Sequence, residues 1–577
     1  MNFYRSFNAP PVELGFSFPF GLATSFLLLI CFSSLTRAHQ QQRTRDKSQT
    51  GQAGTVDSTS NELAQAASLL QSGQIAQAES ALRKLITEHP RNADAHTLLG
   101  VVLDQKQLNA EAEREYNEAL ALKPDSITPL TNLAVLLAKT NRLTESIEKF
   151  EAVLRIDPHH PTAVFNLGIL YARQGDYSRA VPLLEESAGI NRHNSLQVSS
   201  NDNAVVFLLL QAYLHTNRKA DAIKLSRSIE ESASADPRTL FTLALSYAEA
   251  REYKEAVRLF KHTDALRPHT YEVLYNLGVA LYNLDRLEEA KQSLSSASTV
   301  SPNQAEPFYR LGLIASAQGD TKSALICWTK AIELKPDFAE ANFMIGEELL
   351  KKHLFDKSLP YYERALELDP HKLVYFLRLG VANFRAKRYD VARDVFTRAL
   401  QQFPGDPNLY FLLGYTGRAG GQYDIAVNAF REALKLQPDN ADVLENLGYI
   451  VGQRGDYDEA QRLLKRAIQI DDNAFPAYHD LGRLLVKLKK YQEALTFLRR
   501  GAELNARDPG IHYQLFIAYS RLGNKADADR ELALFKELDS TSRPPSSASG
   551  SSTRQGNPGE ADVLPPLPSS VSGDKKP

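Results

Sequence analysis

The chain has 577 residues, with 67 basic and 69 acidic side chains, so that its formal net charge is only −2. Nucleic-acid-binding domains usually carry a basic surplus, and this balance argues against a dominant role in binding polyanions. At about 150 residues per domain the length would predict several globular domains. An internal repeat replaces that expectation with a single continuous array.

The first predicted element is an uncharged, mostly apolar run at residues 18–35, with Arg5 before it. Thr36 and Ala38 are small residues that favour cleavage after Ala38, so we predict a secretory signal peptide over residues 1–38. The alternative is an uncleaved signal anchor, because the run approaches the length that spans a bilayer. Basic residues are more numerous after the run than before it, which opposes that anchor. We therefore expect an extracytoplasmic protein, periplasmic or secreted, with membrane anchoring by residues 18–35 as the alternative.

The clearest structural unit in the sequence is residues 305–336, which read as two amphipathic helices joined by a tight turn. Gly312 lies on the first helix and lets the second helix approach closely. Gly319 can adopt a positive φ in the turn, and Asp320 can cap the helix that follows. Pro336 ends the second helix, because proline lacks the amide donor and clashes with a continuing helix.

Three residue positions of this helical hairpin recur every 34 residues along the chain (278 − 244, 312 − 278). The small residue of the first helix recurs as Ala244, Gly278, Gly312, Gly346, Gly380, Gly414, Gly448 and Gly482. The small residue of the second helix recurs as Ala256, Ala290, Ala324, Ser358, Ala392, Ala426, Ala460 and Ala494. The terminating proline recurs as Pro268, Pro302, Pro336, Pro370, Pro404 and Pro438.

These marks resemble the tetratricopeptide repeat, a helix–turn–helix unit of about 34 residues. The resemblance implies an all-α fold, a right-handed superhelical solenoid of about fourteen repeats in which each repeat packs against its neighbours. It also implies that the first helix of each repeat lines a concave groove that binds protein partners.

The register of the repeat slips once. The position occupied by Gly168 in one repeat is occupied by Leu210 in the next, a step of 42 residues (210 − 168). This step exceeds one period by eight residues, so we predict an insertion loop at residues 191–203. The predicted order is a signal peptide or anchor at 1–38, a disordered linker at 39–60, repeats 1–4 at 61–190, the insertion loop, repeats 5–14 at 204–540 and a disordered tail at 541–577. The linker is polar and the tail is rich in Ser, Pro and Gly, compositions that do not bury a core.

The sequence lacks the motifs that carry catalysis. It has no Walker phosphate loop, no dinucleotide glycine fingerprint, no CxxC and no HExxH. We therefore predict no enzyme, no cofactor and no metal site. His159 and His160 are adjacent in a loop, which we interpret as a solvated turn instead of a pair of metal ligands. Residues 454–456 spell the adhesion tripeptide Arg-Gly-Asp, but they occupy the turn equivalent to residues 318–320 and are interpreted as turn residues.

The place three residues before the small residue of the first helix carries an aromatic ring in most of the central repeats. In repeats four to eleven it is occupied by Phe165, Phe207, Phe241, Tyr275, Tyr309, Phe343, Leu377 and Phe411. Two interpretations remain open. The rings either pack against neighbouring helices as in the family's common pattern, or they form a partly exposed ladder that grips an extended ligand. Aromatic rings give a large contact area at low entropic cost, which favours them at interfaces.

The next place along the helix carries asparagine in four repeats, namely Asn132, Asn166, Asn276 and Asn446. An asparagine amide can both donate to and accept from a peptide backbone. This resembles the asparagine ladder in the tetratricopeptide region of O-linked N-acetylglucosamine transferase, although Thr242 and Arg310 are among the residues that interrupt it here. No stretch outside the repeats is long enough for that enzyme's catalytic domain. Basic candidates for the same surface are Arg173, Arg310, Lys351, Arg385, Arg418, Arg483 and Lys487.

Together these features predict a non-catalytic scaffold that binds segments of protein partners in the concave groove. The aromatic and asparagine residues are its candidate binding residues. The alternative is an assembly factor for envelope polysaccharide or pilus secretion. We expect no nucleic-acid partner, and a membrane partner only if the N-terminal apolar run is not cleaved.

Overall fold

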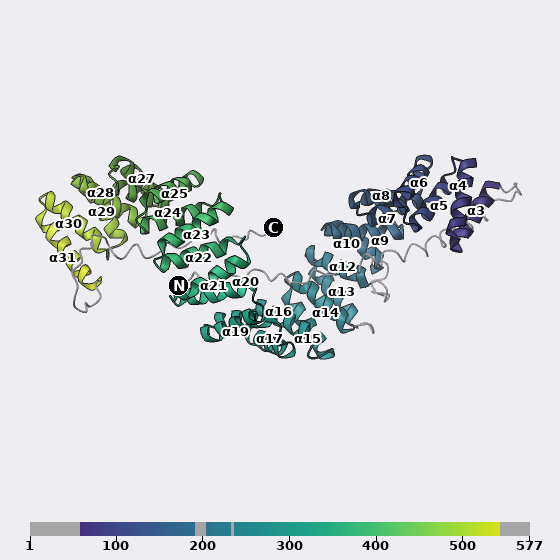
Figure 1. The fold of residues 1–577 in the computed structure, drawn as a ribbon, viewed down its shortest axis with the longest axis horizontal. Helices are drawn as coiled ribbons and strands as arrows, with labels where there is room; N and C mark the ends of the chain where they lie inside the picture. Colours follow the sequence, from purple (N-terminus) through teal and green to yellow (C-terminus); the bar gives the residue numbers. More distant parts are fainter. Residues whose placement is uncertain (1–57, 191–202, 232–235, 543–577) are drawn as a thin grey trace. The chain divides into compact units, whose positions relative to one another are not determined.

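The computed structural model describes residues 58–190, 203–231 and 236–542. Within these ranges the chain forms 28 α-helices and no strand, which confirms the predicted all-α repeat fold. Consecutive helices pack against each other as fourteen pairs (Figure 1). The contacts divide the chain into two compact units. We call their described residues the N-terminal unit, which comprises 58–190, 203–231 and 236–301, and the C-terminal unit, which comprises 302–542.

The N-terminal unit contains seven helix pairs within the described residues. They are α3 (Ser58–Gln71) with α4 (Ile75–Glu88), α5 (Ala93–Gln105) with α6 (Asn109–Leu122), α7 (Ile127–Lys139) with α8 (Leu143–Ile156), α9 (Pro161–Arg173) with α10 (Tyr177–Ser187), α12 (Asn203–His215) with α13 (Lys219–Glu231), α14 (Pro237–Glu249) with α15 (Tyr253–Leu266), and α16 (Tyr271–Asn283) with α17 (Leu287–Val300).

The described part of the C-terminal unit contains seven more pairs. They are α18 (Ala305–Ala317) with α19 (Thr321–Leu334), α20 (Ala339–Lys351) with α21 (Phe355–Leu368), α22 (Leu373–Arg385) with α23 (Tyr389–Gln402), α24 (Pro407–Ala419) with α25 (Tyr423–Leu436), α26 (Ala441–Gln453) with α27 (Tyr457–Ile470), α28 (Phe475–Lys487) with α29 (Tyr491–Leu504), and α30 (Pro509–Arg521) with α31 (Lys525–Ser542).

Several predicted segments lie wholly or largely outside the described residues. They are the signal peptide or anchor at 1–38, the linker at 39–60, the loop at 191–203 and the tail at 541–577. At their edges, α3 begins at Ser58, three residues ahead of the predicted first repeat, and α31 continues to Ser542. Serine and threonine are well tolerated at the start of a helix, which accounts for the earlier beginning of α3.

Where the first helix of a pair carries a glycine at the small-residue place, a large side chain of the second helix packs over it. In the pair α18–α19, Trp328 is fully buried (0% exposed) against Gly312. A Cβ atom at Gly312 would lie 2.4 Å from the indole nitrogen, far inside van der Waals contact. The indole N–H also donates to the carbonyl of Tyr309 at 3.1 Å. Phe396 covers Gly380 in the same way, so the small residue is required by the ring above it.

The turn between the two helices of this pair has the predicted geometry. Gly319 has a φ of +78°, in the left-handed region that glycine adopts without a steric penalty. The carboxylate of Asp320 accepts a hydrogen bond from the backbone N–H of Ser323 at 3.0 Å, which caps α19. The helix ends at Leu334, before Pro336.

The Arg-Gly-Asp segment at residues 454–456 forms the same kind of turn. Its glycine has a φ of +97°, and the Asp456 carboxylate caps α27 by accepting from the N–H of Glu459 at 3.1 Å. The aspartate is therefore occupied by a structural role. Other repeats place a non-glycine residue in this left-handed position, for example Lys387 with a φ of +59°.

Neighbouring repeats pack through two kinds of contact. The second helix of one repeat lies against the first helix of the next, as in α4 with α5, α15 with α16 and α25 with α26. Successive first helices also touch, as in α5 with α7, α12 with α14 and α26 with α28, and they approach more closely than successive second helices do. The first helices therefore lie on the inner side of each unit. We call the surface built from their residues three and two places before the small residue the first-helix face.

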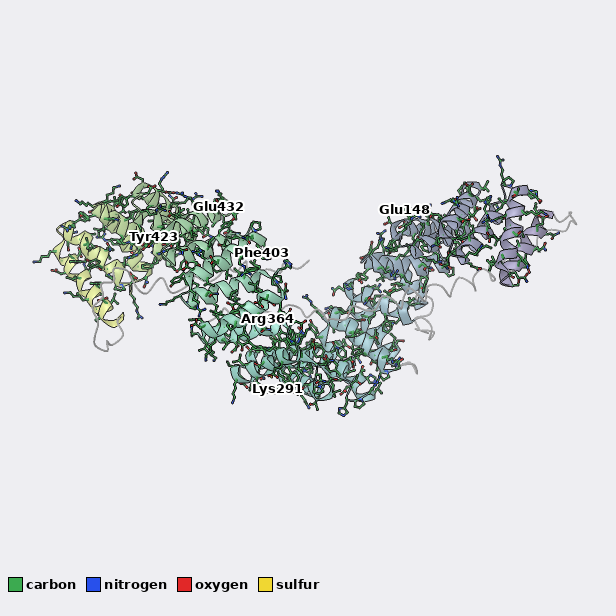
Figure 2. The ribbon with its side chains drawn as sticks, in the orientation of Figure 1. Glu148, Lys291, Arg364, Phe403, Tyr423 and Glu432 are labelled. Carbon is green, nitrogen blue, oxygen red and sulfur yellow. The ribbon has the colours of Figure 1, made fainter. Side chains whose placement is uncertain are left out.

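Charged side chains lie on the second helices of both units. Glu148 on α8, Lys291 on α17 and Arg364 on α21 are exposed (Figure 2). Among the described helices, none combines the length and the apolar character needed to cross a bilayer.

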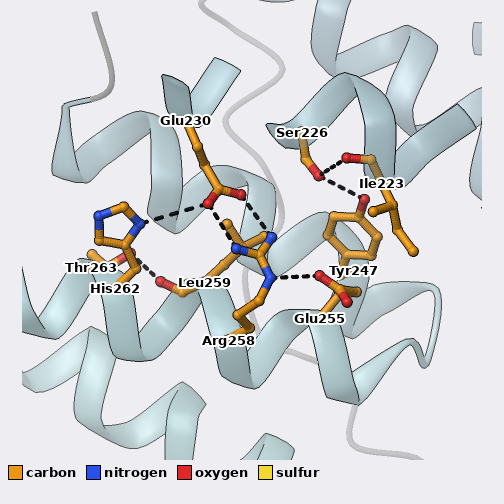
Figure 3. Close-up of polar contacts among 9 residues, drawn as sticks. All are labelled: Ile223, Ser226, Glu230, Tyr247, Glu255, Arg258, Leu259, His262 and Thr263. Carbon is orange, nitrogen blue, oxygen red and sulfur yellow. Dashed lines mark hydrogen bonds and ion pairs between the residues drawn. The ribbon is translucent and has the colours of Figure 1, made fainter. Parts of the chain in front are cut away.

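Ion pairs join successive second helices at a spacing of 28 residues. On α15, the guanidinium of Arg258 donates to both carboxylate oxygens of Glu230 on α13, each at 2.7 Å (Figure 3). Between them on α14, the hydroxyl of Tyr247 shares a 3.0 Å hydrogen bond with Ser226. Other pairs at this spacing are Lys261 with Glu289, Arg431 with Glu459 and Lys465 with Glu493. These contacts join the second helices of four pairs of successive repeats.

Candidate functional site

In the N-terminal unit, the predicted ring positions lie partly open on the first-helix face. The rings are Phe165 on α9, Phe207 on α12, Phe241 on α14 and Tyr275 on α16, and all four are half-buried. Phe241 packs against Phe260 of its own second helix, with ring centroids 5.8 Å apart. Each of the four rings therefore keeps part of its surface available for contact, and packing against Phe260 fixes the ring of Phe241.

In the C-terminal unit, the same positions are packed more deeply. Tyr309 is only 9% exposed and Phe411 only 8% exposed, whereas Phe343 is half-buried. Tyr309 is covered by an additional ring, because Phe338 lies 4.9 Å from it between ring centroids. Phe343 stays half-buried, although Tyr375 lies 5.0 Å away. Tyr309 and Phe411 therefore serve mainly as packing residues, which is the first of the two interpretations of the sequence.

The asparagine amides are held by their own helices. The Nδ2 groups of Asn166, Asn276 and Asn446 each donate to the carbonyl four residues earlier at 2.8 Å. This contact uses one of the two amide hydrogens and fixes the side-chain orientation. The Oδ1 atom of Asn276 and the Nδ2 group of Asn132 are buried and have no hydrogen-bond partner in the described structure. Whether these asparagines contact a partner chain stays a prediction.

The basic candidates differ in how far they are engaged. Lys351 pairs with Glu348 at 3.1 Å, and Arg483 donates to Asp480 at 2.9 Å. Arg310 lies with its guanidinium carbon 5.3 Å from the centroid of the Tyr309 ring. Arg418 donates to the amide oxygen of Asn446 at 2.5 Å. Lys351, Arg483 and Arg418 therefore make contacts within the array, and their charged groups are engaged by neighbouring side chains.

A buried polar cluster on α26 and α28 was not predicted from the sequence. Glu445 and Asp480 are each 7% exposed, and His479 is 8% exposed. Glu445 occupies the place that carries a ring in earlier repeats, and Asp480 occupies the place of the asparagines. The signal that could have revealed the cluster is this replacement of two ordinarily apolar or neutral positions by carboxylates in adjacent repeats.

The adjacent histidines of the loop before α9 have separate structural roles. The Nδ1 atom of His159 lies 2.7 Å from a carboxylate oxygen of Glu186. The ring of His160 accepts from the backbone N–H of Ala163 and caps α9. Across the described part of the chain, no three His, Cys, Asp or Glu side chains gather closely enough to hold a metal ion.

The structure thus consists of repeated helix pairs. A small residue, an aromatic ring and a turn recur at the same positions in many of these pairs. Models of the tetratricopeptide repeat match residues 63–127 and 131–195, and also residues 418–485 and 453–515. The chain carries tetratricopeptide repeats. Residues 183–403, which overlap the end of the match at 131–195, match the C-terminal domain of cilia and flagella-associated protein 70. No curated protein matches the sequence.

Several solved structures are similar to parts of the chain. Yeast Tom70 is 17% identical, with 78% of this chain and 99% of that chain covered and a TM-score of 0.29. The Naa15/Naa10 complex bound to HypK-THB is 13% identical, with 84% of this chain and 94% of that chain covered and a TM-score of 0.33. The C-terminal part of a TPR repeat-containing protein from Cytophaga hutchinsonii is 18% identical, with 42% of this chain and 99% of that chain covered and a TM-score of 0.38. At these values the structures carry no argument about function. As a class, proteins with these repeats bind protein partners.

Proposed function

We propose that this chain is a non-catalytic scaffold that binds partner proteins along the first-helix face of its N-terminal unit. The observation that carries the proposal is the set of four half-buried rings, Phe165, Phe207, Phe241 and Tyr275, repeated on successive first helices. A partner segment with apolar side chains would cover the open part of each ring.

Rigidity and repetition both favour binding by these rings. Phe241 packs against Phe260 and Tyr275 stacks on Tyr271 within their own repeats, so little conformational entropy is lost when a partner covers these two rings. Rings of this kind cost about 1 to 2 kcal/mol of binding free energy when truncated. Because several repeats present a ring, modest contributions from each can add up to specific binding along the face.

A selection experiment tests the proposal even though the partner is unidentified. Peptides are selected from a displayed random library against the purified full-length chain, and affinities are then measured for the Phe241→Ser/Tyr275→Ser variant. We expect binding to weaken by at least about tenfold. The matched control is Leu266→Ser, which removes a 50% exposed apolar side chain from α15 in the same unit.

Circular dichroism must first show that both variants keep the helical content of the wild type. Equal binding by the ring variant and the wild type would place the binding surface elsewhere. Crosslinked capture from the native cell with the same two variants would then name the partner.

The extracytoplasmic location is a separate part of the proposal. Its support is the apolar run at residues 18–35, followed by small residues that favour cleavage after Ala38. Sequencing the N-terminus of the protein from its native cell would give a residue after Ala38 for an exported protein. An intact N-terminus in the membrane fraction would support the anchor instead.

A scaffold in cilia or flagella is a second candidate, favoured by the family match over residues 183–403. Imaging of the tagged chain distinguishes it from an exported protein. The alternative of a polysaccharide or pilus assembly factor is tested on a glycan array, because aromatic rings also stack on sugars. Binding to glycans that is lost in the Phe241→Ser/Tyr275→Ser variant would favour that alternative over peptide recognition.

A further inference from the structure

The exposed face of α14 has an apolar middle between two charged ends. Four residues at intervals of three, four and four share this face of the helix, namely Arg238, Phe241, Leu245 and Glu249. Arg238 and Glu249 are exposed, and the two apolar residues between them are half-buried. A ligand on this helix would therefore meet apolar surface in the centre and a charge on either side.

The apolar middle continues over the neighbouring first helices of the N-terminal unit. The helices α9, α12, α14 and α16 touch in succession (Figure 1). One row of their middle places is the set of four half-buried rings, and the row one turn further along the helices is Ile169, Gln211, Leu245 and Val279. We call these two rows the central band. Neither row carries a charge, so the band offers apolar contact across four helices.

The polar side chains beside the central band are engaged by their own helices. Asn166 and Asn276 are only 7% and 3% exposed, and each donates to a carbonyl one turn earlier. The hydroxyl of Thr242 donates to the carbonyl of Arg238 at 2.9 Å. The backbone of an extended ligand would lose hydrogen bonds to water on this surface and find few replacements. A helical ligand avoids that cost, because its backbone groups bond to each other.

The width of the face also fits a helix. Arg238 and Glu249 are eleven residues apart (249 − 238), or about 16 Å along the axis of α14. A helix with its side chains is about 10 to 12 Å wide, so it fills the apolar middle and its flanking side chains reach both charged ends. An extended segment, which takes up about 5 Å of width, would leave one end uncovered.

The length of the central band gives the length of that helix. First helices that pack about 10 Å apart place the four rings over about 30 Å. A helix of about 20 residues has this length, and its residues seven apart are separated by about 10 Å. Apolar side chains at every seventh place would therefore meet successive rings.

Unpaired charges at the two ends of the band distinguish the two directions of the helix. Arg173 on α9 and Glu272 on α16 are exposed, and neither forms an ion pair within the described residues. A helix carries a partial positive charge at its N-terminus and a partial negative charge at its C-terminus. Its N-terminus therefore complements Glu272, and its C-terminus complements Arg173.

We propose that the N-terminal unit binds an amphipathic helix of about 20 residues, laid across α9, α12, α14 and α16 with its apolar stripe on the central band. The N-terminus of the bound helix lies at α16 and its C-terminus at α9. This inference rests on the proposed binding role of the rings, and it adds the conformation and the direction of the ligand. It replaces the extended ligand that a ladder of rings and asparagines would grip.

Proline substitution in the ligand tests the helical conformation. The probe is the tightest-binding peptide of about 20 residues selected from a displayed library against the full-length chain. Proline at a central place where alanine leaves the affinity unchanged should weaken binding by about a hundredfold, because proline breaks a helix. Equal binding of the proline and alanine peptides would overturn the helical ligand.

The ring variant separates this failure from a failure of the proposed function. The parent peptide should bind the Phe241→Ser/Tyr275→Ser variant at least about tenfold more weakly than the wild type. If the ring variant loses binding but the proline peptide does not, the rings bind an extended ligand and only the present inference fails. If no selected peptide depends on the rings, both proposals fail.

Crosslinking tests the direction of the helix. A photoreactive group at the N-terminus of the peptide should label α16, and one at its C-terminus should label α9. Glu272→Gln should weaken binding by about two- to fivefold at low salt, because it removes the charge that faces the peptide N-terminus. The matched control Glu148→Gln removes an exposed charge from α8 and should leave binding unchanged (Figure 2). Labelling in the reverse order, or equal effects of the two variants, would overturn the proposed direction.

Discussion

The ring positions of the first-helix faces differ in burial between the two units. In the N-terminal unit, Phe165, Phe207, Phe241 and Tyr275 are all half-buried. In the C-terminal unit, Tyr309 and Phe411 are buried, and the equivalent place in the twelfth repeat carries Glu445 within a buried polar chain. A position in the repeat therefore fixes where a side chain lies along the helix, but its neighbours decide whether it becomes surface, core or part of a polar network.

The largest expected contrast is in stability. Phe411→Ala removes a buried ring that contacts Phe430 and Tyr415, with both centroids 6.1 Å away, and should cost about 3 kcal/mol through lost burial and the cavity left behind. Phe165→Ala removes a half-buried ring and should cost about 1 kcal/mol. Local hydrogen-exchange protection of α24 and α9 measures the two costs. Similar losses at both sites would contradict the contrast between the units.

Partner binding should show the reverse order. Phe165→Ala/Phe207→Ala removes two open rings and should weaken a selected peptide by about 1.5 kcal/mol, or about tenfold. Phe411→Ala should bind that peptide as the wild type does, because its ring is covered in the free protein. Isothermal titration calorimetry with all three proteins checks both statements. Weaker binding by the Phe411 variant would show that the C-terminal unit also takes part.

The outer ion pairs give a smaller contrast. Glu230→Gln breaks a bidentate contact with Arg258 and should reduce local stability by about 1 kcal/mol, with a smaller effect in high salt. Its counterpart Glu459→Gln breaks the longer contacts of 3.1 and 3.2 Å to Arg431 and should cost about 0.5 kcal/mol or less. Exchange protection of α15 and α25 at two salt concentrations measures the difference. A larger loss for Glu459→Gln would reverse the order given by the geometry.

The smallest effects are expected in the turns. Lys387 has a φ of +59°, so Lys387→Gly removes a steric cost and should stabilise its repeat by about 0.5 kcal/mol after the entropic cost of glycine. Gly319→Ala places a Cβ at a φ of +78° and should destabilise by about 1 kcal/mol. The two substitutions therefore act in opposite directions at equivalent turns, and thermal denaturation of the two variants beside the wild type measures both. A loss of stability in the lysine variant would show that its side chain makes contacts that outweigh the backbone.

The sequence predicts much of the fold because its signals are local and repeated. Gly312, Asp320 and Pro336 each act through their own turn or helix end, and the 34-residue period carries that information along the whole chain. The sequence does not predict which rings are exposed. Tyr309 is buried because Phe338 lies against it, and Phe338 belongs to the segment before the next first helix, outside the repeated positions that were compared.

The polar cluster escaped prediction for a related reason. Glu445 and Asp480 are 35 residues apart (480 − 445), so they occupy neighbouring places in successive repeats and are unremarkable one at a time. Only the folded array, in which α26 packs against α28, removes both carboxyl groups from water. Pairwise inspection of polar substitutions in adjacent repeats would find such clusters.

Trp328 gives the protein a built-in optical probe. It is the single tryptophan of the sequence, and it lies fully buried over Gly312 with its N–H bonded to the Tyr309 carbonyl. The intrinsic fluorescence excited at the red edge of its absorption band therefore comes from a single repeat of the array. A red shift of that emission during denaturation reports the opening of the α18–α19 pair, while total ellipticity averages over every helix. The difference between the two transition midpoints measures how independently this repeat unfolds.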